Sequence, residues 1–113
     1  MEKNCLFCRI FKGEIKAEVL YRDEEIMAFK DVNPKAPNHA LVIPAKHIET
    51  INEVSVGDSL LVGKMVAAAS AVAASLNMKS YRLVFNCGPD AGQEVFHIHL
   101  HLLGGRKFGW PPG

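Results

Sequence analysis

The sequence has no strong excess of charge of either sign, few cysteines and a single tryptophan. Its formal net charge is +1, whereas nucleic-acid-binding domains are markedly basic, so binding to nucleic acid is not expected. The 3 cysteines are an odd number, which argues against a disulfide framework and favours a reducing, cytoplasmic compartment. No secretory leader is expected at the start of the chain, and no apolar stretch approaches the pattern of a membrane span.

Hydrophobic residues make up 49% of the sequence, enough for one core in one domain over residues 1–113. Residues 5–12 predict a short helix that ends at Gly13, and a long helix is expected after Ser55, which resembles a capping box with Asp58. The long helix has an apolar stripe at helical spacing: Leu61, Met65, Ala68, Val72 and Leu76. Strands are predicted over 18–22, 25–31, 39–44, 81–87 and 95–105. These elements predict an α+β fold with an antiparallel sheet of about five strands, one long helix and one short helix.

The last predicted strand carries three of the five histidines, because residues 95–105 read VFHIHLHLLGG. Alternate side chains of a strand share one face, so His97, His99 and His101 are expected together, opposite apolar residues that point into a core. Imidazoles placed together disfavour one another's protonation. At least some of them should therefore be neutral near pH 7 and free to act as nucleophile, base or metal ligand.

Two kinds of chemistry fit this row of histidines. One is a zinc site made by the three imidazoles. The other is phosphoryl or nucleotidyl chemistry, in which one imidazole attacks phosphorus and the others hold oxygens and protons. The preceding loop favours the second, because Asn86 lies near it and the glycines at 88 and 92 let backbone N–H groups approach an anion closely.

The triad and its flanks resemble the histidine triad (HIT) superfamily, whose signature alternates histidine with hydrophobic residues. The resemblance covers almost the whole chain, through KGEI, EVLYRDEEIMAFKDVNPKAPNHALVIPAKHI, NCGPDAGQEVFHIHLHLLGGR and the terminal WPPG. These stretches are similar to the histidine triad nucleotide-binding (Hint-like) branch rather than to the diadenosine polyphosphate hydrolases or the uridylyltransferases. The resemblance implies a HIT-like fold and a homodimer whose protomers share a continuous sheet.

The same resemblance implies a purine nucleoside phosphoramidase, which cleaves P–N bonds of nucleoside monophosphate conjugates. By position in the motif, His99 would be the nucleophile that takes the nucleotidyl group, and His101 would contact the α-phosphate or the leaving group. The other nucleotide-binding positions that it implies are Phe29, Asp31 and Val32 at the nucleoside, Asn86, Gly92, Gln93 and Val95 at the phosphate, and Trp110 in a tail that would lie near the partner protomer's active site.

Position 94 departs from the animal members of this branch, which have a serine that helps at the phosphate. A carboxylate cannot do that beside an anion, so Glu94 is expected to turn its side chain away and to offer only its backbone N–H. Bacterial relatives share this glutamate. His39, which opens the strand predicted over 39–44, is expected to have a structural role.

Cys5 and Cys8 form a C-x-x-C pair, a spacing that commonly supplies half of a zinc site. No βαβ pattern follows it, which makes a redox motif a poor alternative. The sequence resembles zinc-containing bacterial members of the superfamily, and this resemblance implies a structural Zn²⁺ on Cys5, Cys8, His47 and His97. His97 would then be structural, and the chemistry itself would need no metal.

Other functions remain open on the sequence alone. The protein could hydrolyse dinucleoside polyphosphates or adenylylated intermediates. It could be a nucleotide-binding scaffold dimer whose turnover is incidental, or a zinc-binding module that uses the triad as ligands.

Overall fold

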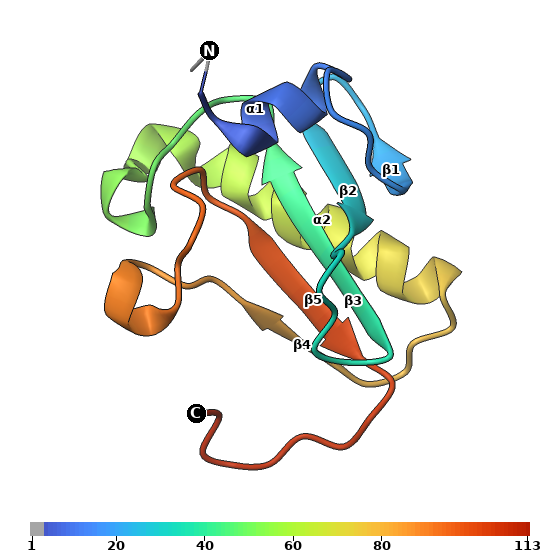
Figure 1. The fold of residues 1–113 in the computed structure, drawn as a ribbon. Coiled ribbons are helices and arrows are strands. Elements are labelled where there is room, and N and C mark those ends of the chain that lie inside the picture. Colours follow the sequence, from blue (N-terminus) through green and yellow to red (C-terminus); the bar gives the residue numbers. More distant parts are fainter. Residues whose placement is uncertain (1–3) are drawn as a thin grey trace.

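Residues 4–113 are described by the computed structural model, and they form a five-stranded antiparallel sheet with a helix on either face (Figure 1). The order in the sheet is β1-β2-β3-β5-β4, so β1 and β4 are its edges. The α+β fold predicted from the sequence is thereby confirmed. The strands are β1 (Val19–Arg22), β2 (Ile26–Lys30), β3 (Asn38–Pro44), β4 (Tyr81–Val84) and β5 (Leu100–Gly104).

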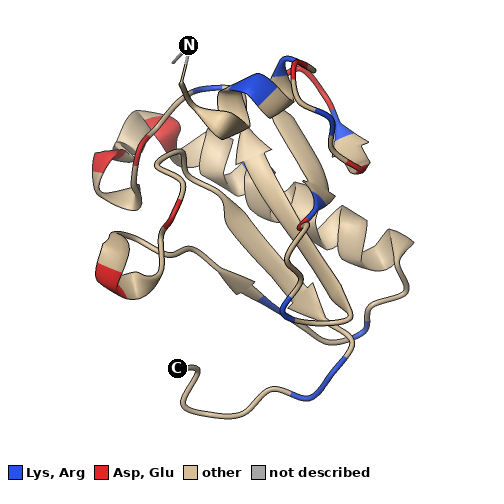
Figure 2. Cartoon of the chain, viewed as in Figure 1, with Lys and Arg blue, Asp and Glu red and all other residues tan. Residues whose placement is uncertain are grey.

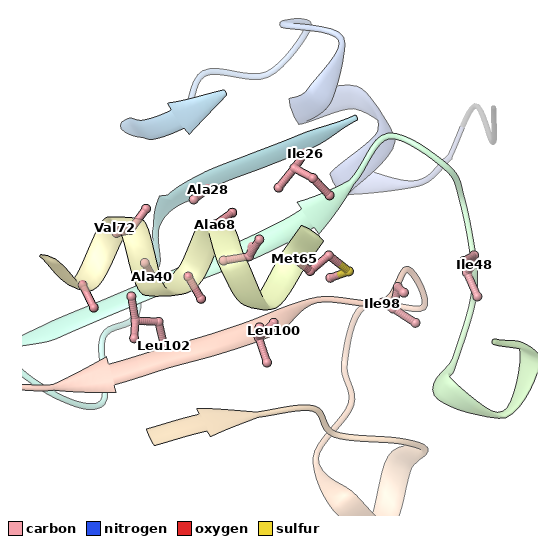
Figure 3. Packing of buried hydrophobic residues seen from close by; sticks show 13 residues of the cluster. Ile26, Ala28, Ala40, Ile48, Met65, Ala68, Val72, Ile98, Leu100 and Leu102 are labelled. Atoms are coloured by element: carbon pink, nitrogen blue, oxygen red, sulfur yellow. The ribbon is translucent and has the colours of Figure 1, made fainter. Parts of the chain in front are cut away.

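The long helix α2 (Ser59–Ser75) covers one face of the sheet. Met65, Ala68 and Val72 of its predicted apolar stripe are buried there, and Leu61 and Leu76 pack against them partly exposed. Figure 3 shows this stripe facing the sheet residues that point toward it. Those sheet residues alternate along their strands, as the pleat requires: Ile26, Ala28, Ala40, Val42, Leu100 and Leu102.

The start of α2 differs slightly from the prediction. Ser55 and Asp58 do form a capping box, with the Ser55 N–H donating to Asp58 Oδ2 at 3.0 Å. The turn that they cap is a short 3₁₀ segment, Val56–Asp58, and the α-helix begins at Ser59. Asn77 follows the helix in the left-handed conformation, with φ of 57°, which ends it.

By length and composition alone, the segment Val56–Ser75 could cross a membrane, with a mean hydropathy of 1.4. By that criterion, the expectation that no apolar stretch approaches the pattern of a membrane span was wrong. In the fold its apolar stripe packs on the sheet (Figure 3), which is the arrangement of a core helix.

The short helix α1 (Leu6–Phe11) packs on the opposite face, as a separate apolar cluster. Cys5 caps its first turn, and Gly13 just beyond it has φ of 82°, a conformation that favours glycine, so the predicted helix and its end are both confirmed. This second cluster takes in Phe7, Ile10, Phe11, Met27, Phe29, Leu41 and Ile43.

Four strands are shorter than predicted, β1 and β2 by only one or two residues and β4 and β5 by more. β5 begins at Leu100 rather than Val95, because Val42 is the last residue of β3 that pairs with it, opposite Leu100. The same register would place Pro44 opposite Ile98, and proline has no N–H to donate. β4 ends at Val84 rather than Cys87, since β5 offers no strand partner before Leu100.

Candidate active site

The three triad histidines lie on the face of the sheet that carries α1. Ile98, Leu100 and Leu102 belong to the core under α2, so the predicted division into two faces is confirmed even where the chain is not yet a strand. On the other side, the Phe7 ring lies 6.0 Å from the His97 ring and 4.9 Å from the His99 ring, centroid to centroid. His97 and His99 are buried, and His101 is half-buried.

Cys5, Cys8, His47 and His97 converge on one point, with their ligand atoms all within 4.8 Å of one another. Cys5 Sγ lies 3.3 Å from His97 Nδ1, Cys8 Sγ lies 3.4 Å from His47 Nδ1, and the two Nδ1 atoms are 3.2 Å apart. Bond lengths of about 2.0 Å to nitrogen and 2.3 Å to sulfur put tetrahedral ligands of zinc at such separations. The four side chains therefore fit a closed Cys₂His₂ site.

The hydrogen bonds around this cluster suit metal binding as well. His97 Nε2 lies 2.8 Å from the Pro44 carbonyl oxygen, which can only accept, so Nε2 carries the proton and Nδ1 is left as a lone-pair donor. Burial, more than any neighbour, lowers the pKa of His97 to about 4, so no proton competes for Nδ1 at neutral pH. Cys5 Sγ accepts the Cys8 N–H at 3.3 Å, so this sulfur also caps the first turn of α1.

His99 is held in the tautomer that a nucleophile requires. Its Nδ1 lies 2.8 Å from the His97 carbonyl oxygen, so Nδ1 carries the proton and Nε2 presents an unshared pair. Burial lowers the pKa of His99, although the His97 carbonyl and Asp31 act in the opposite sense. The ring is therefore neutral at pH 7, and the Nδ1 bond fixes its orientation.

His101 is held in the other tautomer, and His39 is the reason. The Lys35 backbone N–H donates to His39 Nδ1 at 3.0 Å, so His39 carries its proton on Nε2. That Nε2–H lies 2.9 Å from His101 Nδ1, which accepts it, and the His101 proton is consequently on Nε2. Burial lowers the pKa of His39, and burial with the neighbouring His99 and His39 lowers that of His101 to about 4.

Asp31, His39 and His101 also bring three potential metal-ligand atoms within 4.8 Å of one another. The Lys35 N–H argues against a metal there, because it occupies His39 Nδ1 and forces the proton onto Nε2, the atom that would have to bind. Asp31 Oδ2 lies 3.3 Å from His39 Nε2, and the three residues form a hydrogen-bonded relay. Only a structural role was expected for His39, and its contact with the triad was not predicted.

The loop before the triad is built around Gln93, which is buried. Its side-chain carbonyl accepts the Gly88 N–H at 2.9 Å, and its amide donates to the carbonyls of Glu49 and Val95 at 2.7 and 3.1 Å. Its own N–H donates to the Gly88 carbonyl. The polar atoms of the Gln93 side chain thus make hydrogen bonds that fix the conformation of the loop.

The other residues expected at the phosphate offer hydrogen-bond donors that could bind it. Gly92 has φ of 95° and lies against Asn86, whose Nδ2 would be 3.7 Å from a Cβ at position 92. Within the described residues, the backbone N–H groups of Glu94 and Val95 make no hydrogen bond to the chain. The Glu94 side chain is exposed, in keeping with the expectation that it turns away.

Cationic side chains are missing from the triad and its loop, because residues 83–105 contain neither lysine nor arginine. Figure 2 shows the ribbon of β5 free of both charges, with acidic residues on η1 (Ile51–Glu53), η2 (Val56–Asp58) and η3 (Pro89–Ala91). Any anion here would be held by N–H groups and imidazoles.

The residues expected at the nucleoside are only partly together. Phe29 is buried on the α1 face, with its ring 5.8 Å from that of Phe7, and Asp31 follows β2 toward His39. Val32 and Trp110 are 89% and 84% exposed, so within one chain neither is covered by the site. The Trp110 ring lies instead near the Arg82 guanidinium.

Comparisons with known proteins agree with this geometry. Residues 4–108 match the family model described as "Scavenger mRNA decapping enzyme C-term binding". The crystal structure of a HIT family hydrolase from Legionella pneumophila superposes with a TM-score of 0.93 at 54% identity, covering 97% of this chain and 100% of that one. The purine nucleoside phosphoramidase of Escherichia coli is 40% identical over 111 residues, 96% of this chain and 93% of its own length. A HIT-like protein of Synechocystis is 46% identical over the full length of both.

The family match, these relatives and the paired tautomers of His99 and His101 lead to one conclusion: the chain belongs to the histidine triad (HIT) superfamily, in its Hint-like branch.

Proposed function

We propose that the protein is a purine nucleoside phosphoramidase that works through a nucleotidyl-His99 intermediate. The observation that carries this proposal is the His99 Nδ1–H bond to the His97 carbonyl, 2.8 Å long, which leaves Nε2 as a neutral nucleophile. The E. coli relative named for the same activity supports it.

In the first step, His99 Nε2 attacks phosphorus and the P–N bond breaks. The positive charge that develops on the His99 ring is stabilised by the His97 carbonyl at Nδ1. Water then attacks phosphorus, the N–P bond to His99 breaks, and the nucleoside monophosphate leaves. One proton of this water passes to His101, which regains the charge it had before the amine left, and the other proton leaves with the phosphate.

The leaving amine departs with a proton, and His101 Nε2–H is the group that supplies it. An anionic substrate raises the pKa of a nearby imidazole and draws one extra proton onto His101, so the ring ends neutral after the transfer. In that charged state His101 Nδ1 no longer accepts from His39. Asp31, 3.3 Å from His39 Nε2, is the acceptor that takes over the His39 N–H.

The phosphate oxygens would be bound by the Asn86 side-chain amide and by the backbone N–H groups of Glu94 and Val95. Gly92 allows their close approach, and Gln93 holds the loop in shape. Phe29 would pack on the purine, Asp31 would bind the ribose, and Val32 would pack on the nucleoside. The exposure of Val32 supports this, since its apolar surface is uncovered in a single chain.

We infer that a structural Zn²⁺ is bound by Cys5, Cys8, His47 and His97. The near-tetrahedral separations and the protonated His97 Nε2 support this assignment. When bound, the ion joins the start of α1 to the chain before β5, and it supplies no reactive group. A reducing cytoplasm would keep both thiols available to the metal.

We also propose a homodimer with a continuous sheet. β4 is an edge strand of the sheet, and unpaired edges are usually covered. The outer side of α2 exposes Leu60 and Val66, 71% and 42% accessible, and Lys64 is the one charged residue of the helix. Trp110, which would reach the partner's site, is likewise uncovered in one chain. Measuring the molar mass in solution by light scattering would test the dimer.

The decisive experiment combines two substrates with one variant. An adenosine 5′-phosphoramidate should be hydrolysed to the monophosphate with or without a chelator, and much faster than a dinucleoside polyphosphate. His99→Gly should abolish this hydrolysis yet retain binding of adenosine monophosphate. Turnover by His99→Gly would refute the nucleophile, a preference for the polyphosphate would refute the substrate class, and nucleotide binding without cleavage would favour a scaffold.

The zinc assignment has its own test, which does not depend on turnover. Metal analysis of the purified chain should find one zinc per chain, and Cys5→Ser should reduce this content strongly. Cys87→Ser is the matched control, because Cys87 lies outside the cluster. Equal zinc content in all three proteins would exclude this site.

A further inference from the structure

Phe7 lies between the Cys/His cluster and the nucleophile. Its ring centroid is 6.0 Å from that of His97, a member of the cluster, and 4.9 Å from that of His99, both in edge-to-face geometry. It also lies 5.8 Å from Phe29, the residue assigned to the purine. Phe7 is only 4% exposed, so it has no room to turn away from these rings without moving its backbone.

The backbone of Phe7 is fixed by the cluster on both sides. Cys5 and Cys8 flank it in the sequence, and Cys5 Sγ accepts the Cys8 N–H, so the same sulfur caps α1 and belongs to the cluster. α1 has six residues, too few to be stable as an isolated helix. Its position therefore depends on packing and on whatever holds the two sulfurs together.

We propose that Phe7 is a positioning residue that couples metal occupancy at Cys5, Cys8, His47 and His97 to nucleotide binding at His99. With the metal bound, α1 is held and Phe7 fixes the faces of His99 and Phe29. Without it, the first turn of α1 loses its anchor and the wall made by Phe7 loosens. This proposal rests on the proposed function, because it takes His99 and Phe29 as the nucleotide site.

Coupling of this kind is reciprocal, so it can be measured without turnover. Zinc affinity is determined by competition with a chelator, with and without saturating adenosine monophosphate. Since edge-to-face aromatic contacts contribute about 1 kcal/mol each, the nucleotide should strengthen zinc binding by about fivefold to tenfold in the wild type. In Phe7→Leu this strengthening should disappear.

Phe11→Leu is the matched control. Phe11 is on the same helix, is similarly buried at 7% exposure, and lies under the Arg22 guanidinium instead of against a histidine. It should keep the wild-type coupling. If Phe11→Leu loses it as fully as Phe7→Leu, general loosening of α1 is the cause and the role of Phe7 is refuted. If Phe7→Leu retains it, the link runs through the His97 backbone, and the proposal is refuted too.

A second measurement needs no nucleotide, so it separates this proposal from the proposed function. The NMR signals of the His99 ring are compared between zinc-loaded and chelator-treated protein. The change on metal removal should be smaller in Phe7→Leu than in the wild type and Phe11→Leu. An equal change in all three proteins overturns the coupling, whereas failure of the wild type to bind adenosine monophosphate overturns the proposed function.

Discussion

Replacing His39 should slow the reaction through its effect on His101, although His39 is too far along the relay to donate a proton itself. His39→Leu removes the Nε2–H that lies 2.9 Å from His101 Nδ1, and His101 is then free to carry its proton on either nitrogen. His39→Gln retains an N–H donor near the same position. The two variants therefore differ in the one hydrogen bond that fixes the His101 tautomer.

The size of the effect follows from that bond. The His39 side chain is 3% exposed, so no water readily replaces it. A buried hydrogen bond contributes about 1–1.5 kcal/mol, and this one fixes the neutral His101 tautomer that the substrate meets before the extra proton arrives. His39→Leu should therefore lower kcat/KM by about fivefold to tenfold. His39→Leu also leaves the Lys35 N–H without its acceptor, at a cost of about 1–3 kcal/mol in the free energy of unfolding.

The assay is single-turnover hydrolysis of two adenosine phosphoramidates, one with a weakly basic aryl amine and one with a strongly basic alkyl amine. Proton donation matters more for the alkyl amine, so His39→Leu should lose more activity with that substrate, and His39→Gln should recover most of it. Urea unfolding confirms that both variants are folded. Equal losses with the two amines, or no recovery with glutamine, would refute the role of His39.

Three further predictions concern pH, the backbone and the loop. Because burial lowers the pKa of His101 to about 4 while the unfolded ring titrates near 6.5, the stabilisation is complete above pH 6.5 and is lost as pH falls toward 4. Urea unfolding with chelator at pH 7 and 4.5 should show the wild type losing about 2 kcal/mol more than His101→Gln, and equal losses would contradict this. Gly105→Ala should lower the free energy of unfolding by about 1–3 kcal/mol, because φ is 93° and the new Cβ would be 2.8 Å from Pro37 Cβ. Gly109→Ala is the control and should leave the free energy of unfolding unchanged, because nothing lies within 4 Å of its new Cβ. Gln93→Leu should raise KM for the phosphoramidate more than it lowers kcat, because the Gly88 N–H loses its acceptor, and an unchanged KM would count against the loop's role.

The faces of the triad could be predicted because they depend on local geometry alone. An extended backbone alternates its side chains whether or not a neighbouring strand pairs with it, so His97 and His99 lie opposite Ile98 although β5 begins only at Leu100. The strand boundary could not be predicted in the same way. It depends on the residue of β3 that the same register would place opposite Ile98, and that residue is a proline.

The role of His39 was hidden for a similar reason. His39 and His101 are 62 residues apart in the sequence. They meet because β3 pairs with β5 so that His39 faces Leu103, which is two residues along the strand from His101. Gln93 differs again, because its motif position suggested contact with phosphate. Only the folded loop reveals that its amide and its N–H are taken up by Gly88, Glu49 and Val95.

The cation-free stretch over residues 83–105 has a consequence for selectivity by charge. Neutral donors attract an anion over short distances only, so binding here should depend little on ionic strength, unlike binding to a lysine- or arginine-lined phosphate site. Each additional phosphate on a nucleotide would add negative charge beside a stretch of chain that has no lysine or arginine to meet it. Under the proposed function, such a pocket would suit ligands that carry one phosphorus, and it would let the monophosphate product depart readily.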